Sequence, residues 1–169
     1  ENGVILIVFS SLTKKENVDE FIERNLLEYQ ELDKRHIFFE DLYIYLIKKS
    51  ELLKKIEKKK IKNIKYFTKG HRGVLFTGFY KNKKIVVKAK LAESKATGRI
   101  QNEIKYLKIL NKKKIGQKLL SYNKDYFAYE FTDGDFIGNY IEKSDKKDII
   151  KIIKNMFNQL FIIDKLKID

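Results

Sequence analysis

Residues 70 to 88 read GHRGVLFTGFYKNKKIVVK, and the fold expected for the second part of the chain rests on them. Two β-like runs, residues 74–80 and 85–90, are joined by the polar residues 81–84, as in a β-hairpin. Another short run, residues 65–68, precedes the glycines. Glycine lets a backbone approach a phosphate closely and leaves its N–H groups accessible. The pattern predicts a glycine turn between two strands, followed by a hairpin.

Lys88 lies in the second strand of this hairpin. Because side chains alternate between the faces of a strand, Lys88 shares a face with Val86 and Lys90. That face is expected to be partly buried, so a lysine there is a candidate functional residue. The alternative is an edge strand with solvated lysines, since charged side chains are mostly exposed.

A helix is expected at residues 95–111, with Ile100, Ile104 and Leu107 on one apolar stripe. Glu103 falls within this stripe. An ionised carboxylate on a buried face needs a cationic partner, and the strand lysine is the nearest candidate in the expected topology. The alternative is a glutamate that extends from the flank of the stripe into solvent.

Two more strands and two helices are expected after this helix. The strands cover residues 118–123 and 126–131 and are joined through 123–125, and the helices cover 136–142 and 146–166. The order from residue 64 onward is therefore β-β-β-α-β-β-α-α. The long last helix is apolar nearly all round, which predicts that it is buried. This chain alone would leave a large apolar patch, so we expect a missing lobe or a partner chain, a second copy included, to cover it.

The glycine turn, strand lysine, helix glutamate, strand and connection together resemble the N-terminal lobe of protein kinases. Over about residues 64–169 the chain looks like small atypical kinases: the predicted serine/threonine kinases described in archaea, distant relatives of RIO-type and Bud-type kinases. The strings that carry the resemblance are KGHRG (69–73), VVK (86–88), NEI (102–104), IGQKL (115–119), YEF (129–131) and IDKL (163–166).

The resemblance implies an α+β fold with a kinase-like N-terminal lobe at residues 63–132. This lobe would have a five-stranded antiparallel sheet and one αC-type helix. The hinge and the first helices of a C-terminal lobe would occupy residues 133–169. The implied activity is that of an ATP-dependent serine/threonine protein kinase, with ATP and Mg²⁺ as cofactors and a protein as substrate.

The resemblance also implies a role for each matching residue. Lys88 would contact the α- and β-phosphates of ATP, and Glu103 would hold Lys88 in place. The other implied ATP-binding residues are Gly70 and Gly73 over the phosphates, Leu75 and Val86 beside the nucleotide, Tyr129 at the gatekeeper position, and Glu130 and Thr132 with backbone groups facing adenine.

The chain departs from the kinase pattern at several points. Thr68 stands where the first glycine of G-x-G-x-x-G falls, and Gln117 stands where the family usually has proline. No catalytic loop and no D-F-G-like motif occur. We therefore expect the catalytic base and the magnesium ligands beyond Asp169, and we expect this chain alone to be inactive. A pseudokinase or nucleotide-binding scaffold is the alternative.

The first 62 residues match no motif, and a mostly helical segment is expected there. Residues 4–9 form an apolar, β-branched run that predicts a buried strand. Thr13 and Glu16 have capping-box spacing, and helices are expected at residues 17–34 and 38–58.

The composition limits the remaining functions. The chain has 37 Lys and Arg against 23 Asp and Glu, a net charge of +14, two histidines and no cysteine. A disulfide framework and a thiolate metal site are excluded, and with only two histidines a His-based zinc site is not expected. No apolar run is long enough to span a bilayer and no signal peptide is evident, so a cytoplasmic protein without membrane contact is expected. The lysines of residues 54–65 leave a nucleic-acid-binding module open, although taken alone they favour a solvated lysine-rich face.

Overall fold

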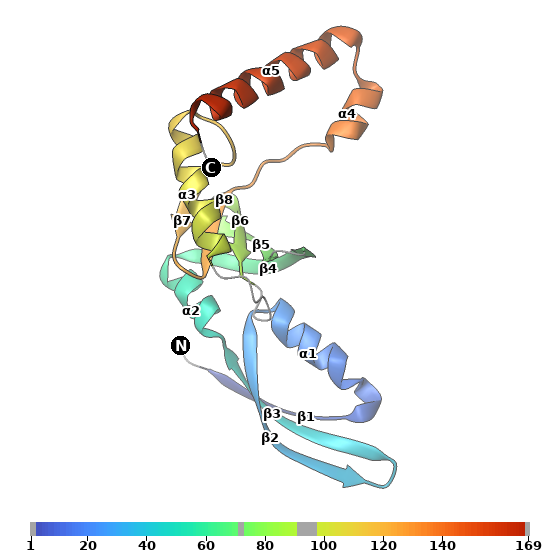
Figure 1. Cartoon of the computed structure of the whole chain (residues 1–169). Helices are drawn as coiled ribbons and strands as arrows, with labels where there is room; N and C mark the ends of the chain where they lie inside the picture. Colours follow the sequence, from blue (N-terminus) through green and yellow to red (C-terminus); the bar gives the residue numbers. More distant parts are fainter. Residues whose placement is uncertain (1–2, 71–72, 91–97, 168–169) are drawn as a thin grey trace. The chain divides into compact units, whose positions relative to one another are not determined.

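The computed structural model describes residues 3–70, 73–90 and 98–167 of the 169-residue chain. It is an α+β structure with two antiparallel sheets, one in the strand order β1-β3-β2 and one in the order β4-β5-β6-β8-β7 (Figure 1). Contacts divide the chain into two compact units, residues 1–92 and 93–169. Among the described residues, no helix combines the length and the hydropathy needed to cross a membrane. The domain boundaries expected at residues 62 and 132 stay predictions.

The first sheet is covered on one face by a short helix. Its elements are β1 (Val4–Ser10), the 3-10 turn Ser11–Thr13, α1 (Lys15–Arg24), β2 (Leu27–Ile37) and β3 (Glu40–Lys49). Figure 1 shows α1 beside the strands of this sheet. Ile22 of α1 packs against Tyr43, Tyr45 and Ile47 of β3, and these four residues form the core of this layer.

The mostly helical segment expected at residues 1–62 is wrong, because strands replace much of both helices. The helix expected at residues 17–34 ends at Arg24. Leu26 then has a φ of 54°, which turns the chain, and β2 pairs with β3 from Leu27 onward. Leu26, Tyr29 and Leu32 are three residues apart, which imitates a helical stripe.

The helix expected at residues 38–58 forms only in its last part. Residues 40–49 form β3, where buried Tyr43 and Tyr45 alternate with half-buried neighbours. Aromatic and β-branched residues favour a strand with apolar side chains on both faces. The helix α2 (Glu51–Lys58) begins after Ser50, whose Oγ accepts a hydrogen bond from the N–H of Leu53 at 3.2 Å.

Two further expectations for this region are wrong. The cap of α1 is Lys14, which has a φ of 61° and makes no side-chain capping bond, so the Thr13–Glu16 capping box does not form. The strand expected at residues 4–9 is present, but it is not buried. It lies at the edge of its sheet, and Val4, Ile5, Leu6 and Val8 are 57–62% exposed.

The strands expected around the glycines are confirmed. They are β4 (Ile61–Gly70), β5 (Gly73–Tyr80) and β6 (Lys83–Ala89). β5 and β6 form a hairpin whose two turn residues, Lys81 and Asn82, have φ values of 50° and 63°. Such left-handed pairs match the twist of the flanking strands.

In the second unit a helix packs on the hairpin that follows it. The elements are α3 (Arg99–Lys112), β7 (Leu119–Tyr122) and β8 (Tyr126–Glu130), close to the expected positions, although residues 95–97 of the expected helix lie outside the described residues. Ile100 and Ile104 pack against Phe127. Asn123 forms the expected turn between the strands, because its Oδ1 accepts hydrogen bonds from the N–H groups of Asp125 and Tyr126.

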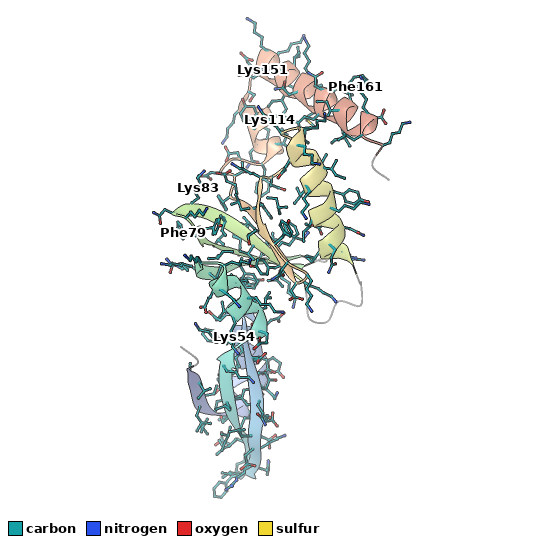
Figure 2. All side chains as sticks on the ribbon, turned by 90° about the vertical axis from the view of Figure 1, so that its left-hand side faces the viewer. Lys54, Phe79, Lys83, Lys114, Lys151 and Phe161 are labelled. Atoms are coloured by element: carbon teal, nitrogen blue, oxygen red, sulfur yellow. The ribbon has the colours of Figure 1, made fainter. Side chains whose placement is uncertain are left out.

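The two last helices, α4 (Ile137–Lys143) and α5 (Lys146–Lys165), occur where they are expected. The structure buries no residue of α5, so the burial predicted for it does not occur within this chain. Met156, Phe157, Leu160 and Phe161 are 53–67% exposed, and Figure 2 shows Phe161 and Lys151 extending from the helix.

Candidate functional site

Four of the predicted nucleotide-binding residues lie on one face of the β5–β6 hairpin. Leu75 is paired with Lys88 and Thr77 with Val86, and directly opposed residues of an antiparallel pair share a face. Gly73 is two residues before Leu75 and is therefore on that face as well. Lys88 is half-buried, whereas Val86 is 6% exposed. The register of the hairpin therefore brings these four residues onto one face, and their role in nucleotide binding stays a prediction.

The two glycines of the predicted phosphate loop have different surroundings. Gly70 and Gly73 face each other across the β4–β5 pair, and the two residues between them lie outside the described residues. A Cβ atom on Gly73 would lie 2.7 Å from the carbonyl oxygen of Ala89 and 3.5 Å from Cε of Lys88. A Cβ on Gly70 would meet nothing closer than 3.8 Å. Gly73 therefore lets β6 and the stem of Lys88 come close to β5.

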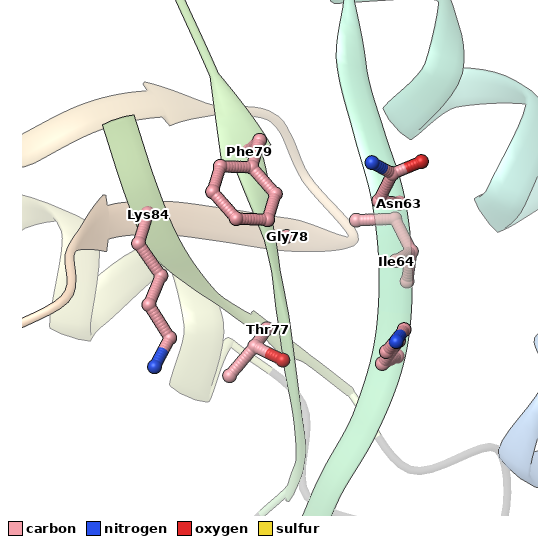
Figure 3. Close-up of a pocket in the computed structure, with 7 residues that line it drawn as sticks. Asn63, Ile64, Thr77, Gly78, Phe79 and Lys84 are labelled. Carbon is pink, nitrogen blue, oxygen red and sulfur yellow. The ribbon is translucent and has the colours of Figure 1, made fainter. Parts of the chain in front are cut away.

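The same face carries a row of lysines and an open hollow. Lys65 is paired with Thr77, and Lys62 and Lys84 are both paired with Phe79, so these lysines share the face of Lys88. The hollow has a volume of about 450 Å³ and lies on three neighbouring strands (Figure 3). Its lining residues are Asn63, Ile64, Lys65, Thr77, Gly78, Phe79 and Lys84. A phosphate-bearing ligand would meet positive charge along the whole face.

Gly78 and a bulge in β4 shape this hollow. No motif in the sequence predicts the hollow. The strand register shifts between Lys62 and Lys65, and Asn63 has a φ of 52°. A Cβ on Gly78 would lie 2.7 Å from Cδ1 of Ile64. A glycine inside a strand often marks a bulge or a close approach, and this signal was available in the sequence.

Helix α1 contacts β4, the strand that leads into the glycine turn. The ammonium of Lys69, next to Gly70, lies 3.1 Å from Oε1 of Glu23. The guanidinium of Arg24 lies 4.9 Å from the ring centre of Tyr66. Sequence reasoning missed both contacts because their partners are more than forty residues apart. Both contacts join α1 to β4.

In the second unit, Glu103 lies near the predicted gatekeeper Tyr129. Glu103 is half-buried on α3, and Tyr129 packs against the cluster of Ile100, Ile104 and Phe127. Burial raises the pKa of the Tyr129 hydroxyl above its usual range, and the nearby charge of Glu103 adds to this effect. The pairing of Glu103 with Lys88 joins two separately described units and stays a prediction.

The predicted adenine-facing residues follow directly on β8. Glu130 is its last residue, and its N–H donates a 3.0 Å hydrogen bond to the carbonyl of Lys118. This N–H of Glu130 is therefore already engaged within the chain. Thr132 is exposed in the irregular segment that leads to α4.

Comparison with known protein families, curated proteins and solved structures found no match to this chain. Within the part of the chain that the structure describes, no three or more His, Cys, Asp or Glu side chains lie close enough together to hold a metal ion.

Proposed function

We propose that this chain is the ATP-binding part of a serine/threonine protein-kinase-like phosphotransferase. The observation that carries the proposal is the common face of Gly73, Leu75, Val86 and Lys88 on the β5–β6 hairpin. In the kinase-like arrangement these positions provide the loop over the phosphates, the two apolar contacts beside the nucleotide and the phosphate-binding lysine.

The geometry of this face suits a nucleoside triphosphate. Half-buried Leu75 offers apolar surface next to Lys88, with buried Val86 beneath this face, so a base and a phosphate group can be bound by neighbouring residues. Lysines 62, 65 and 84 attract a polyanion to the same face. Phosphoryl transfer depends mainly on positioning and on neutralising charge, and this chain supplies such groups for the nucleotide.

Nucleotide binding by the 169-residue chain tests the proposal. Charge-assisted hydrogen bonds contribute roughly 1.5–3 kcal/mol, so Lys88→Ala should weaken ATP affinity by about 10- to 100-fold in calorimetric titrations with magnesium. Lys83→Ala is the matched control, because it removes the same charge from the opposite face of β6, where Lys83 is paired with Tyr80. Equal affinities of Lys88→Ala and the unchanged protein would refute the assignment of Lys88.

The lysine face also supports a second candidate, a module that binds single-stranded nucleic acid. Phe79 is 45% exposed beside Lys62 and Lys84, and aromatic side chains between lysines can stack on bases. Binding through several phosphates would give an affinity that falls steeply with salt. Tight binding of an oligonucleotide with such a slope, combined with no ATP binding, would favour this candidate over the kinase-like one.

A further inference from the structure

Strand β1 presents an unprotected edge in the first unit. It is the outer strand of its sheet and pairs with β3 over all seven residues, Val4 to Ser10. Its residues VILIVFS include no charge, no proline and no register shift. An apolar edge strand of this kind is a template on which another strand can pair.

The opposite edge of the same sheet is protected in the ways that β1 lacks. β2 carries Glu28, Glu31, Asp33, Lys34 and Arg35, and its pairing with β3 shifts between Glu31 and Asp33. Charged side chains and bulges hinder edge-to-edge pairing. The contrast within one small sheet identifies β1 as the edge available to a partner.

The exposed side chains of β1 continue an apolar surface onto the neighbouring strand. Val4, Leu6 and Val8 are 60–62% exposed and share a face that α1 does not cover. On that face Leu6 is paired with Leu46 and Val8 with Ile44, both half-buried. A second hollow of about 320 Å³, lined in part by Val4, Ile5, Leu27 and Ile47, lies beside the start of the strand.

We propose that the protein forms a two-fold symmetric dimer in which β1 pairs antiparallel with β1 of a second copy. A strand that is uncharged and apolar on both faces matches β1, which offers no charge for recognition, and β1 itself has this chemistry. An antiparallel pair of identical strands is self-complementary, as a two-fold interface requires. Centred on Ile7, the pairing places Val4 opposite Ser10 and Leu6 opposite Val8 of the second copy.

The pairing would join two three-stranded sheets into one sheet of six strands. An antiparallel ladder of this length provides about six to eight main-chain hydrogen bonds. The apolar residues of β1 from both copies would then form one continuous stripe. This arrangement removes the exposed edge, which is how closed or paired sheets avoid uncontrolled association.

Sedimentation velocity of the 169-residue chain tests the proposal. We expect a dimer, and we expect Leu6→Lys and Val8→Lys to sediment as monomers with unchanged circular dichroism, because both side chains are about 60% exposed. Gln30→Lys places the same charge on β2, and Phe157→Lys places it on the exposed face of α5. Both controls should remain dimers. The proposal would be overturned if the protein without substitutions sedimented as a monomer. It would also be overturned if Phe157→Lys were the one variant that lost the dimer.

Disulfide trapping gives a second, independent measurement. The chain has no cysteine, so Leu6→Cys, Ile7→Cys and Val8→Cys each introduce a single thiol near the proposed two-fold axis. At least one of these variants should form a covalent dimer on mild oxidation, whereas Leu32→Cys on β2 should not. Failure of all three, or equal cross-linking of Leu32→Cys, would contradict pairing through β1.

Discussion

Replacing Gly73 by alanine should weaken the fold, whereas the same change at Gly70 should not. The structure places a Cβ on Gly73 at 2.7 Å from the carbonyl oxygen of Ala89. That oxygen belongs to the backbone of β6 and cannot rotate away as a side chain could. The Cβ would also touch Cε and Cγ of Lys88, but at 3.5 and 3.7 Å, which are ordinary contacts. The strain therefore falls on the β5–β6 pairing.

The size of the effect follows from two opposing contributions. Overpacking a well-fitted site costs about 1–3 kcal/mol. Alanine also restricts the unfolded chain relative to glycine, which stabilises the folded state by about 0.4–1 kcal/mol. Gly73→Ala should thus lower the free energy of unfolding by about 1–2 kcal/mol, whereas Gly70→Ala, with its nearest contact at 3.8 Å, should leave it unchanged or slightly higher.

Urea denaturation followed by circular dichroism measures both variants under the same conditions. The slope of the transition should stay constant if only stability changes. Nucleotide titration of the folded Gly73→Ala protein shows whether the shifted β6 also disturbs Lys88. Equal stability of the two variants, or a larger loss in Gly70→Ala, would refute the close approach of β6 to Gly73.

Two further predictions concern the second unit and the first sheet. The side-chain amide of Asn111 donates hydrogen bonds to the carbonyls of Ile115 and Gln117, and its oxygen accepts one from the N–H of Leu119. Asn111→Ala should lower the unfolding free energy by about 2 kcal/mol, while Asn102→Ala on the exposed side of α3 should not; equal urea midpoints would contradict this. In the first sheet, burial raises the pKa of the Tyr45 hydroxyl far above its usual value. The unfolded chain then releases this proton near pH 10 while the folded chain keeps it, so stability should fall as pH rises above about 10. Tyr45→Phe should reduce this fall between pH 9 and about 11 in urea titrations, and an unchanged pH dependence would argue against burial of the hydroxyl.

The sequence predicted the second half of the chain better than the first for a physical reason. Between residues 64 and 166, glycines and polar turn residues separate short runs of apolar residues, so each element has a visible start and end. In β2 and β3 the pattern is ambiguous. Tyr43 and Tyr45 alternate as in a strand, but Leu42, Ile44 and Leu46 fill the other face and complete a helical stripe equally well. Only the pairing with β1 and β2 decides between these alternatives.

The long-range partners of the candidate site could not be predicted in this way. Alternation within one strand is a local property, so the common face of Val86 and Lys88 follows from β6 alone, whereas Leu75 joins them through the register of the β5–β6 hairpin. The contacts of Glu23 with Lys69 and of Arg24 with Tyr66 depend on how α1 packs on β4. Glu23 and Arg24 by themselves are ordinary surface charges at the end of a short helix. Their place beside the glycine turn connects the N-terminal layer with the strand that leads into the proposed phosphate loop, and no motif in those residues predicts this connection.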